Sequence, residues 1–170
     1  MVWVIIAIGF VVGYSLYYQY HFKKYKESGL KEEHTEILKE ELKKKITDSG
    51  IDLKGKIVLN GHFTKQVSHL WQTTTYYSYL IIFSEDQRNI ELYGYIPDGE
   101  EILHLGSFFP QQISIHNKSD VLFNFIFHDE NMKQVYSVQV LKEILPQESE
   151  LQIQYPQTEE LSLFIKKLKE

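Results

Sequence analysis

The N-terminus of the chain is an apolar run, Val2–Tyr18, that contains no charged residue. Extended to Phe22, the run has 21 residues, which as an α-helix span roughly 30 Å, the thickness of the hydrocarbon core of a bilayer. Trp3 lies near one end, and tyrosines that include Tyr18 gather at the other, as aromatic residues do at a membrane interface. We therefore predict a single-pass transmembrane anchor at residues 1–22.

Two other interpretations of this run fit it less well. A buried core helix usually carries a polar face, and this segment has none before its final residues. A cleaved signal peptide needs a basic start and a small-residue cleavage site, whereas Met1 leads directly into the apolar run. An uncleaved signal-anchor is the prediction that remains.

The charges that flank the span predict its orientation. Lys23, Lys24 and Lys26 follow it at once, and no basic side chain precedes it. Because basic residues stay on the cytoplasmic side of a membrane, we expect the N-terminus outside the cell membrane and the C-terminal domain in the cytoplasm.

Two glycines one helical turn apart lie within the span. Gly9 and Gly13 form a G-x-x-x-G motif, which lets two membrane helices approach closely. Because the motif is short, two interpretations stay open. The glycines form the contact face of a homodimer, or they simply face lipid.

Residues 23–50 predict a charged linker helix. Leu38, Leu42 and Ile46 recur every four residues, and Gly50 follows as a C-terminal cap. A surface helix that packs this narrow stripe on the domain is favoured over a short coiled coil, because the period is four rather than 3.5.

Composition narrows the class of the chain further. The linker from residue 23 to 47 holds eight Lys and six Glu, a net charge of +2. Because the net charge of the whole chain is −5, residues 48–170 carry a net charge of −7. An acidic distal part argues against nucleic-acid binding. Zero cysteines exclude disulfides, thiolate metal sites and a cysteine nucleophile.

The pattern changes to alternation of apolar and polar residues from residue 51 onward, with polar turns between short segments. This pattern predicts a mainly-β (α+β) domain over residues 51–170, a seven- to eight-stranded antiparallel barrel or sandwich. The expected strands are 56–59, 73–83, 89–96, 102–109, 113–116, 121–127, 135–141 and 151–155.

A C-terminal helix over residues 158–169 is expected to close the domain. Thr158 is the expected N-cap, and Lys167 is expected on the solvent face. The apolar residues fall at i, i+3, i+4 and i+7, which are Leu161, Phe164, Ile165 and Leu168.

The order of these elements resembles the pleckstrin-homology-like superfold, a strand meander closed by one C-terminal amphipathic helix. The similar texture lies in TYYSYLIIFSEDQRNIELYGY, FNFIFHDENMKQVYSVQV and TEELSLFIKKLKE. The resemblance implies a small barrel that serves binding more often than catalysis. Lys65 and His69 are too few basic residues, near the first strand connection, for a phosphoinositide pocket.

The chain shows no pattern of a known catalytic or cofactor site. No phosphate loop, dinucleotide fingerprint, nucleophile elbow or EF-hand occurs. The acids lie in turns, and the histidines are scattered, so we expect no catalytic residue, no metal and no cofactor. The histidines are His21, His34, His62, His69, His104, His116 and His128.

The clearest candidate contact surface is aromatic. Trp71, Tyr77 and Tyr79 lie close together in a segment where alternation turns half of the rings away from the core, and exposed aromatic groups are typical of protein interfaces.

These features predict a membrane-anchored, non-catalytic protein-binding domain at the inner face of a bacterial plasma membrane, with the lipid bilayer and an unidentified protein as partners. Its Lys-, Ile- and Glu-rich, cysteine-free composition is typical of an AT-rich bacterium or its phage. Two alternatives stay open. One is a prophage-type superinfection-exclusion or phage-resistance membrane protein, and the other is an enzyme with an unrecognised His and carboxylate site.

Overall fold

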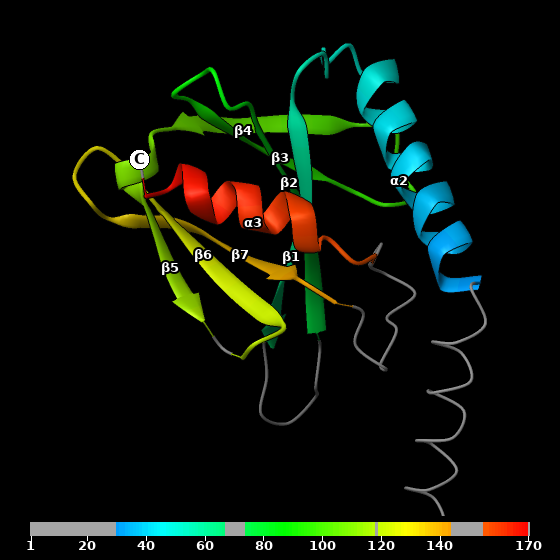
Figure 1. Ribbon diagram of the computed structural model, residues 1–170. Helices are drawn as coiled ribbons and strands as arrows, with labels where there is room; N and C mark the ends of the chain where they lie inside the picture. The colour runs from blue at the N-terminus through cyan, green and yellow to red at the C-terminus, as the bar shows by residue number, and fades with distance from the viewer. Residues whose placement is uncertain (1–29, 67–73, 118, 144–154, 170) are drawn as a thin grey trace, which may run out of the picture. The chain divides into compact units, whose positions relative to one another are not determined.

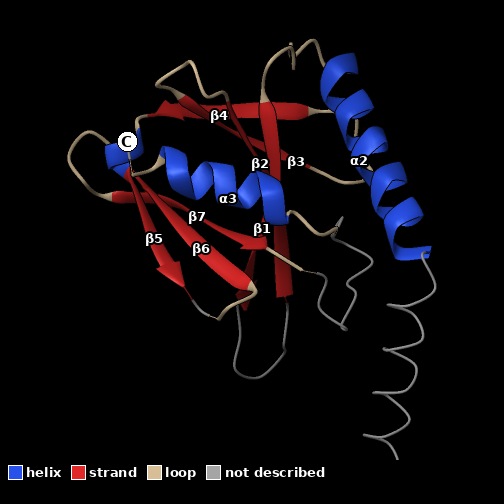
Figure 2. Cartoon of the chain, in the orientation of Figure 1, coloured by secondary structure: helices blue, strands red, loops and turns tan. Residues whose placement is uncertain are grey.

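A computed structural model describes residues 30–66, 74–117, 119–143 and 155–169 of the chain. The chain divides into two compact units, residues 1–39 and 40–170. The described elements (Figures 1 and 2) are, in order, α2 (Leu30–Asp48), β1 (Ile57–Gln66), β2 (Thr74–Phe83), β3 (Ile90–Tyr95), β4 (Ile102–Phe108), the 3-10 turn Pro110–Gln112, β5 (Ile113–Asn117), β6 (Leu122–His128), β7 (Gln134–Leu141) and α3 (Thr158–Lys167).

The strands form one antiparallel sheet of seven strands in the order β4-β3-β2-β1-β7-β6-β5. The mainly-β prediction and its first seven strands are therefore confirmed. The expected eighth strand lies outside the described residues except for Tyr155. β1 pairs with β2 along Ile57–Gln66, but with β7 only through His62 and Gln139. The sheet thus has two halves, β1–β4 and β5–β7, and His62–Gln139 is the one pair of the described residues that joins them in register.

The core lies between the two halves and is closed by α3, which runs across them in Figure 1. Phe164 of α3 is fully buried, and its ring centroid lies 5.0 Å from that of Phe83 and 4.9 Å from that of Phe125. One helix side chain thereby contacts a strand of each half. Phe164 is buried as predicted and Leu161 is buried beside it, whereas Leu168, which was also expected to be buried, and Ile165 are only partly buried.

The last turns of α2 also belong to the domain. Leu42 and Ile46 are buried, and the Lys45 ammonium donates to the carbonyl of Ile96 at 2.6 Å and of Pro97 at 2.7 Å. Gly50 ends the helix at φ +86°, and its N–H bonds to the carbonyl of Thr47. This part of the linker therefore packs on the domain, as the favoured interpretation predicted, and the predicted glycine cap is confirmed.

Two details of the predicted C-terminal helix are wrong. Gln157, not Thr158, occupies the N-cap position, and the hydroxyl of Thr158 donates to the carbonyl of Lys142 at 3.3 Å. Lys167 is 8% exposed rather than solvated, and its ammonium donates to the carbonyl of Glu85 at 2.7 Å. A long lysine stem can cover apolar surface while its charged end reaches a polar partner.

The predicted membrane span lies outside the described residues and stays a prediction. The same holds for its named residues, which are Val2, Trp3, Gly9, Gly13, Tyr18, Lys23, Lys24 and Lys26. Within the part of the chain that the structure describes, no helix is long and apolar enough to cross a membrane.

Candidate functional site

The face of β1 and β2 that points to the core is buried at one end of the strand pair and exposed at the other. Leu59 lies opposite Ile81, and both are fully buried. Farther along the same face, Phe63 lies opposite Tyr77 with 6.4 Å between the ring centroids, because side chains two residues apart point to the same side of a strand. The exposed fraction of Tyr77 is 44%. The face that builds the core therefore ends in aromatic side chains that reach solvent.

β7 adds a third tyrosine to this aromatic end. The ring centroid of Tyr136 lies 6.4 Å from that of Tyr79 and 6.3 Å from that of Phe108. Phe108 in turn packs edge-on against Phe127 at 5.0 Å. We name the group Phe63, Tyr77, Tyr79 and Tyr136 the tyrosine cluster. Its continuity with the core holds these rings in place.

The close approach of β7 to β1 depends on a glycine. A Cβ atom at Gly61 would lie 2.3 Å from Cγ1 of Val138 and 3.1 Å from the carbonyl oxygen of Gln139. Gly61 is the register partner of Tyr79. Without a side chain at this position, β7 can cross β1 and bring Tyr136 to Tyr79.

The hydroxyl groups of the cluster influence one another. Burial raises the pKa of Tyr79 above its usual value, and the neighbouring Tyr77 and Tyr136 raise it further. Tyr79 therefore stays a neutral hydroxyl at physiological pH, able both to donate and to accept a hydrogen bond.

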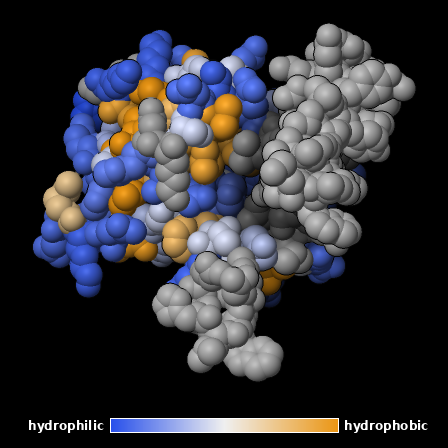
Figure 3. Space-filling model, turned by 90° about the horizontal axis from the view of Figure 1, so that it is seen from below, coloured by the Kyte–Doolittle hydropathy of each residue, from blue (hydrophilic) through white to orange (hydrophobic). Residues whose placement is uncertain are grey.

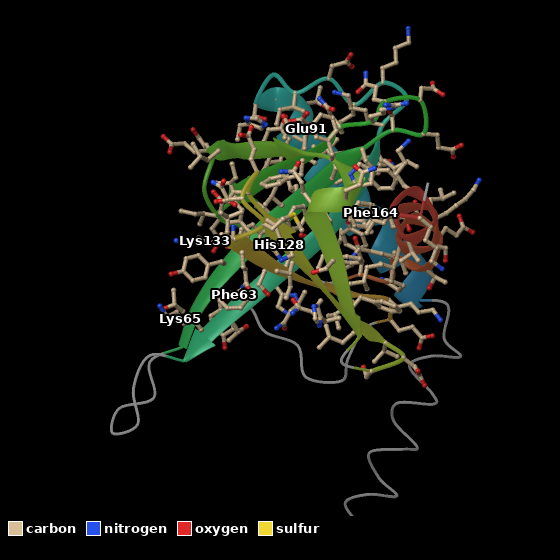
Figure 4. All side chains as sticks on the ribbon, turned by 90° about the vertical axis from the view of Figure 1, so that its left-hand side faces the viewer. Phe63, Lys65, Glu91, His128, Lys133 and Phe164 are labelled. Atoms are coloured by element: carbon tan, nitrogen blue, oxygen red, sulfur yellow. The ribbon has the colours of Figure 1, made fainter. Side chains whose placement is uncertain are left out.

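Cationic side chains lie near the cluster. Lys65 is exposed and follows Phe63 by two residues on the same face of β1, and the exposed Lys133 directly precedes β7. In Figure 4, Phe63 and Lys65 lie toward one end of the β1–β2 pair, whereas Phe164 lies on the other side of the domain. The arrangement combines aromatic faces, neutral hydroxyls and positive charge, which suits non-covalent recognition of a protein.

Other apolar side chains also reach the surface of the domain. Figure 3, viewed from below the orientation of Figure 1, shows apolar residues among hydrophilic ones. The large exposed apolar residues of the domain are Tyr76, Tyr77, Ile96, Leu103, Phe109, Met132 and Val135.

The structure describes two of the three residues of the predicted contact surface. Tyr77 is exposed, Tyr79 is half-buried between Tyr77 and Tyr136, and Trp71 lies outside the described residues, so the contact surface stays a prediction. Sequence reasoning missed Phe63 and Tyr136. The alternation of side chains along a strand predicts which face carries Phe63 or Tyr136, but only the pairing of strands distant in the chain brings these two rings to Tyr77 and Tyr79.

A second polar group lies on β3 and β4. One oxygen of the Glu91 carboxylate contacts Nε2 of His104 at 2.7 Å and accepts the Ser107 hydroxyl at 2.6 Å. The ring of Tyr93 lies 5.0 Å from that of His104, and burial, followed by the charge of Glu91, raises the Tyr93 pKa. Because the Ser107 hydroxyl bonds to Glu91 and not to His104, this geometry does not activate it as a nucleophile.

The remaining described histidines do not gather around a shared centre. Nδ1 of His128 lies 3.0 Å from the carbonyl oxygen of Gln112 and ties the 3-10 turn to β6. His69 lies outside the described residues. Among the residues that the structure describes, no group of three or more His, Cys, Asp or Glu could hold a metal ion.

Comparison with known proteins adds no relative. No protein-family model matches the chain, and neither does a curated protein or a solved structure. The function of the chain must therefore be inferred from the chemistry of its own residues.

Proposed function

We propose that this chain is a membrane-anchored, non-catalytic domain that binds a protein partner through the tyrosine cluster. The observation that carries the proposal is the exposed ring of Tyr77, which packs on Phe63 at the open end of a face continuous with the core. Rigid tyrosines offer a large contact area at low cost in conformational entropy. A site built in this way is already organised before the partner arrives.

The arrangement of the fold supports a binding role. The described strands and α3 form a seven-stranded antiparallel domain with a C-terminal helix, and the sequence resemblance assigns this arrangement to the pleckstrin-homology-like superfold. That superfold serves binding more often than catalysis, although a fold alone does not define a function.

The predicted anchor and the charge distribution support a protein partner at the membrane. The uncharged run up to Tyr18 and the lysines from Lys23 onward favour a domain held at the inner face of a bacterial plasma membrane. The net charge of −7 on residues 48–170 opposes docking of the domain on anionic lipids. The anchor therefore supplies the membrane contact, and the tyrosine cluster stays available for a protein.

Site-specific photo-crosslinking tests this proposal in intact cells that make the full chain. A photoreactive residue replaces Tyr77, and in a matched control it replaces Leu103, which is 66% exposed on β4. We expect a discrete adduct with one other protein from position 77 and none from position 103. Identical adduct patterns from both positions, or adducts with lipid alone from position 77, would contradict the proposal.

A further inference from the structure

The two halves of the sheet part on both sides of the His62–Gln139 pair. Toward α3, the side-chain amide of Gln157 occupies the space between them. Its Oε1 accepts the N–H of Asn60 at 2.6 Å, and its Nε2 donates to the carbonyls of Asn60 at 2.8 Å and Leu141 at 3.4 Å. At this end, the amide of Gln157 thus bonds to main-chain groups of both β1 and β7.

These bonds also show how the two strand edges are oriented. The N–H and C=O of Asn60 point toward β7, and the carbonyl of Leu141 points toward β1. Because main-chain groups alternate between the two edges of a strand, those of Thr64 in β1 and Ser137 in β7 also point into the space between the halves.

On the side away from α3, none of the described strands lies in this space. Among the described residues, β1 and β7 form no pair beyond His62 and Gln139, although β1 continues to Gln66 and β7 begins at Gln134. Thr64 and Val135 are exposed. We name the facing segments 63–66 of β1 and 134–137 of β7 the β1–β7 wedge. Free strand edges of this kind are templates for the addition of another strand.

We propose that an extended segment of the partner adds to the β1–β7 wedge as a strand. The inference rests on the proposed function and specifies the partner's chemistry. The main-chain groups of Thr64 and Ser137 would bond to the added strand, as in other cases of strand addition to a sheet. Alternate side chains of the segment face the tyrosine cluster through Phe63 and Tyr136, so these side chains are aromatic or apolar.

The positive charges near the wedge indicate that the added segment is acidic. Lys65 and Lys133 are exposed, and neither forms an ion pair with another residue in the described part of the chain. The nearby Asp129 carboxylate accepts the N–H groups of Asn131 and Lys133 at 2.9 Å each, within its own turn. Two unpaired ammonium groups near a strand-addition site favour carboxylates at the ends of the segment.

Peptide probes test the main-chain part of this proposal with the full chain in lipid nanodiscs. The probe is a fluorescent, end-capped peptide of alternating Glu and Tyr, and its binding is measured by fluorescence anisotropy. A second peptide has the same side chains but N-methyl groups on alternate residues, which removes main-chain donors. We expect the N-methylated peptide, and a third with Lys in place of Glu, to bind at least about tenfold more weakly, which corresponds to about 1.4 kcal/mol.

A pair of variants tests the wedge on the protein side. Thr64→Pro removes an N–H that points away from β2, so the β1–β2 ladder keeps its bonds. Thr64→Val keeps the N–H and serves as the matched control. We expect Thr64→Pro to bind the Glu–Tyr peptide about three- to tenfold more weakly, the effect of one hydrogen bond, and Thr64→Val to bind like the parent. Circular dichroism spectra show whether both variants are folded, and the N-methyl comparison needs no variant.

Three results would overturn strand addition. They are no binding of the Glu–Tyr peptide, equal binding of its N-methylated form, and a folded Thr64→Pro variant that binds like the parent. If position 77 still crosslinks to a protein in cells under any of these results, the protein-binding function stands and only this mode of binding fails.

Discussion

The side chain of Gln157 bonds to the main chain of Asn60 as a neighbouring strand would. Its amide accepts the Asn60 N–H at 2.6 Å and donates to the Asn60 carbonyl at 2.8 Å, and Gln157 is only 2% exposed. The Asn60 side chain in turn accepts the hydroxyl of Tyr95 at 2.7 Å. The N-cap residue of α3 thereby bonds to the buried main chain of β1 next to the point where β7 turns away.

Replacing Gln157 should therefore destabilise the fold strongly. Gln157→Leu keeps much of the volume but removes the two bonds that the side-chain amide makes to the N–H and C=O of Asn60, and the loss of a bond to a buried polar group costs about 1–3 kcal/mol. We expect the melting temperature of the full chain in detergent, followed by circular dichroism, to fall by several degrees. Gln87→Leu, at an exposed turn position, is the control and should change stability by less than about 0.5 kcal/mol.

Phe164 is the side chain of α3 on which closure of the core depends most. Phe164→Ala removes its contacts with Phe83 and Phe125 and should cost about 3–5 kcal/mol. The control is Lys166→Ala, since Lys166 is exposed. Lys167→Ala should fall between them, because it loses the bond to the Glu85 carbonyl. Equal melting temperatures for Phe164→Ala and Lys166→Ala would show that α3 does not close the core.

Met132 adopts a backbone conformation that favours glycine. Its φ is +61°, in the turn where its N–H bonds to the carbonyl of Asp129 at 3.0 Å, and its side chain is 62% exposed. A left-handed conformation costs an L-residue with a side chain about 1–2 kcal/mol. We expect Met132→Gly to raise the stability against urea by roughly 1 kcal/mol. Loss of stability would mean that the Met132 side chain makes contacts that outweigh the strain.

Two buried tyrosines should make the fold sensitive to alkali. Burial raises the pKa of both Tyr95 and Tyr155 well above the usual value of about 10. In the unfolded chain these hydroxyls ionise near pH 10, whereas in the fold they stay protonated. Their contribution to stability is therefore complete below about pH 10 and is lost as the pH rises toward the folded-state pKa values.

Urea unfolding at about pH 8 and at about pH 11 measures this loss. Burial lowers the pKa of Lys45, so its charged form is destabilising in the fold. Deprotonation of Lys45 between about pH 8 and about pH 11 therefore raises the stability, which opposes the effect of the tyrosines. We expect a net loss of stability in the parent and a smaller loss in Tyr155→Phe, which cannot ionise at that position. An equal pH dependence in the two proteins would show that Tyr155 is accessible to ionisation in the fold.

The parts of the fold that could be predicted from the sequence are those that depend on neighbours in the chain. Alternation marked the seven described strands, the i, i+3, i+4 pattern placed Phe164 in the core, and Gly50 marked the end of α2. Each of these signals is contained within one turn or one strand, because local propensity and the burial of a single face decide it.

The parts that needed the tertiary structure depend on residues far apart in the chain. The pairing of His62 with Gln139 brings Tyr136 to Tyr79. The side chain of Gln157, at the N-cap of α3, bonds to the main chain of Asn60, which lies far from it in the chain. Lys167 is buried for the same reason, since the carbonyl that it reaches belongs to Glu85. The apolar face of each strand and helix follows from the spacing of apolar residues along the chain. Only the packing of the two sheet halves and α3 decided which of those faces meet, because register and closure are set by contacts between distant segments.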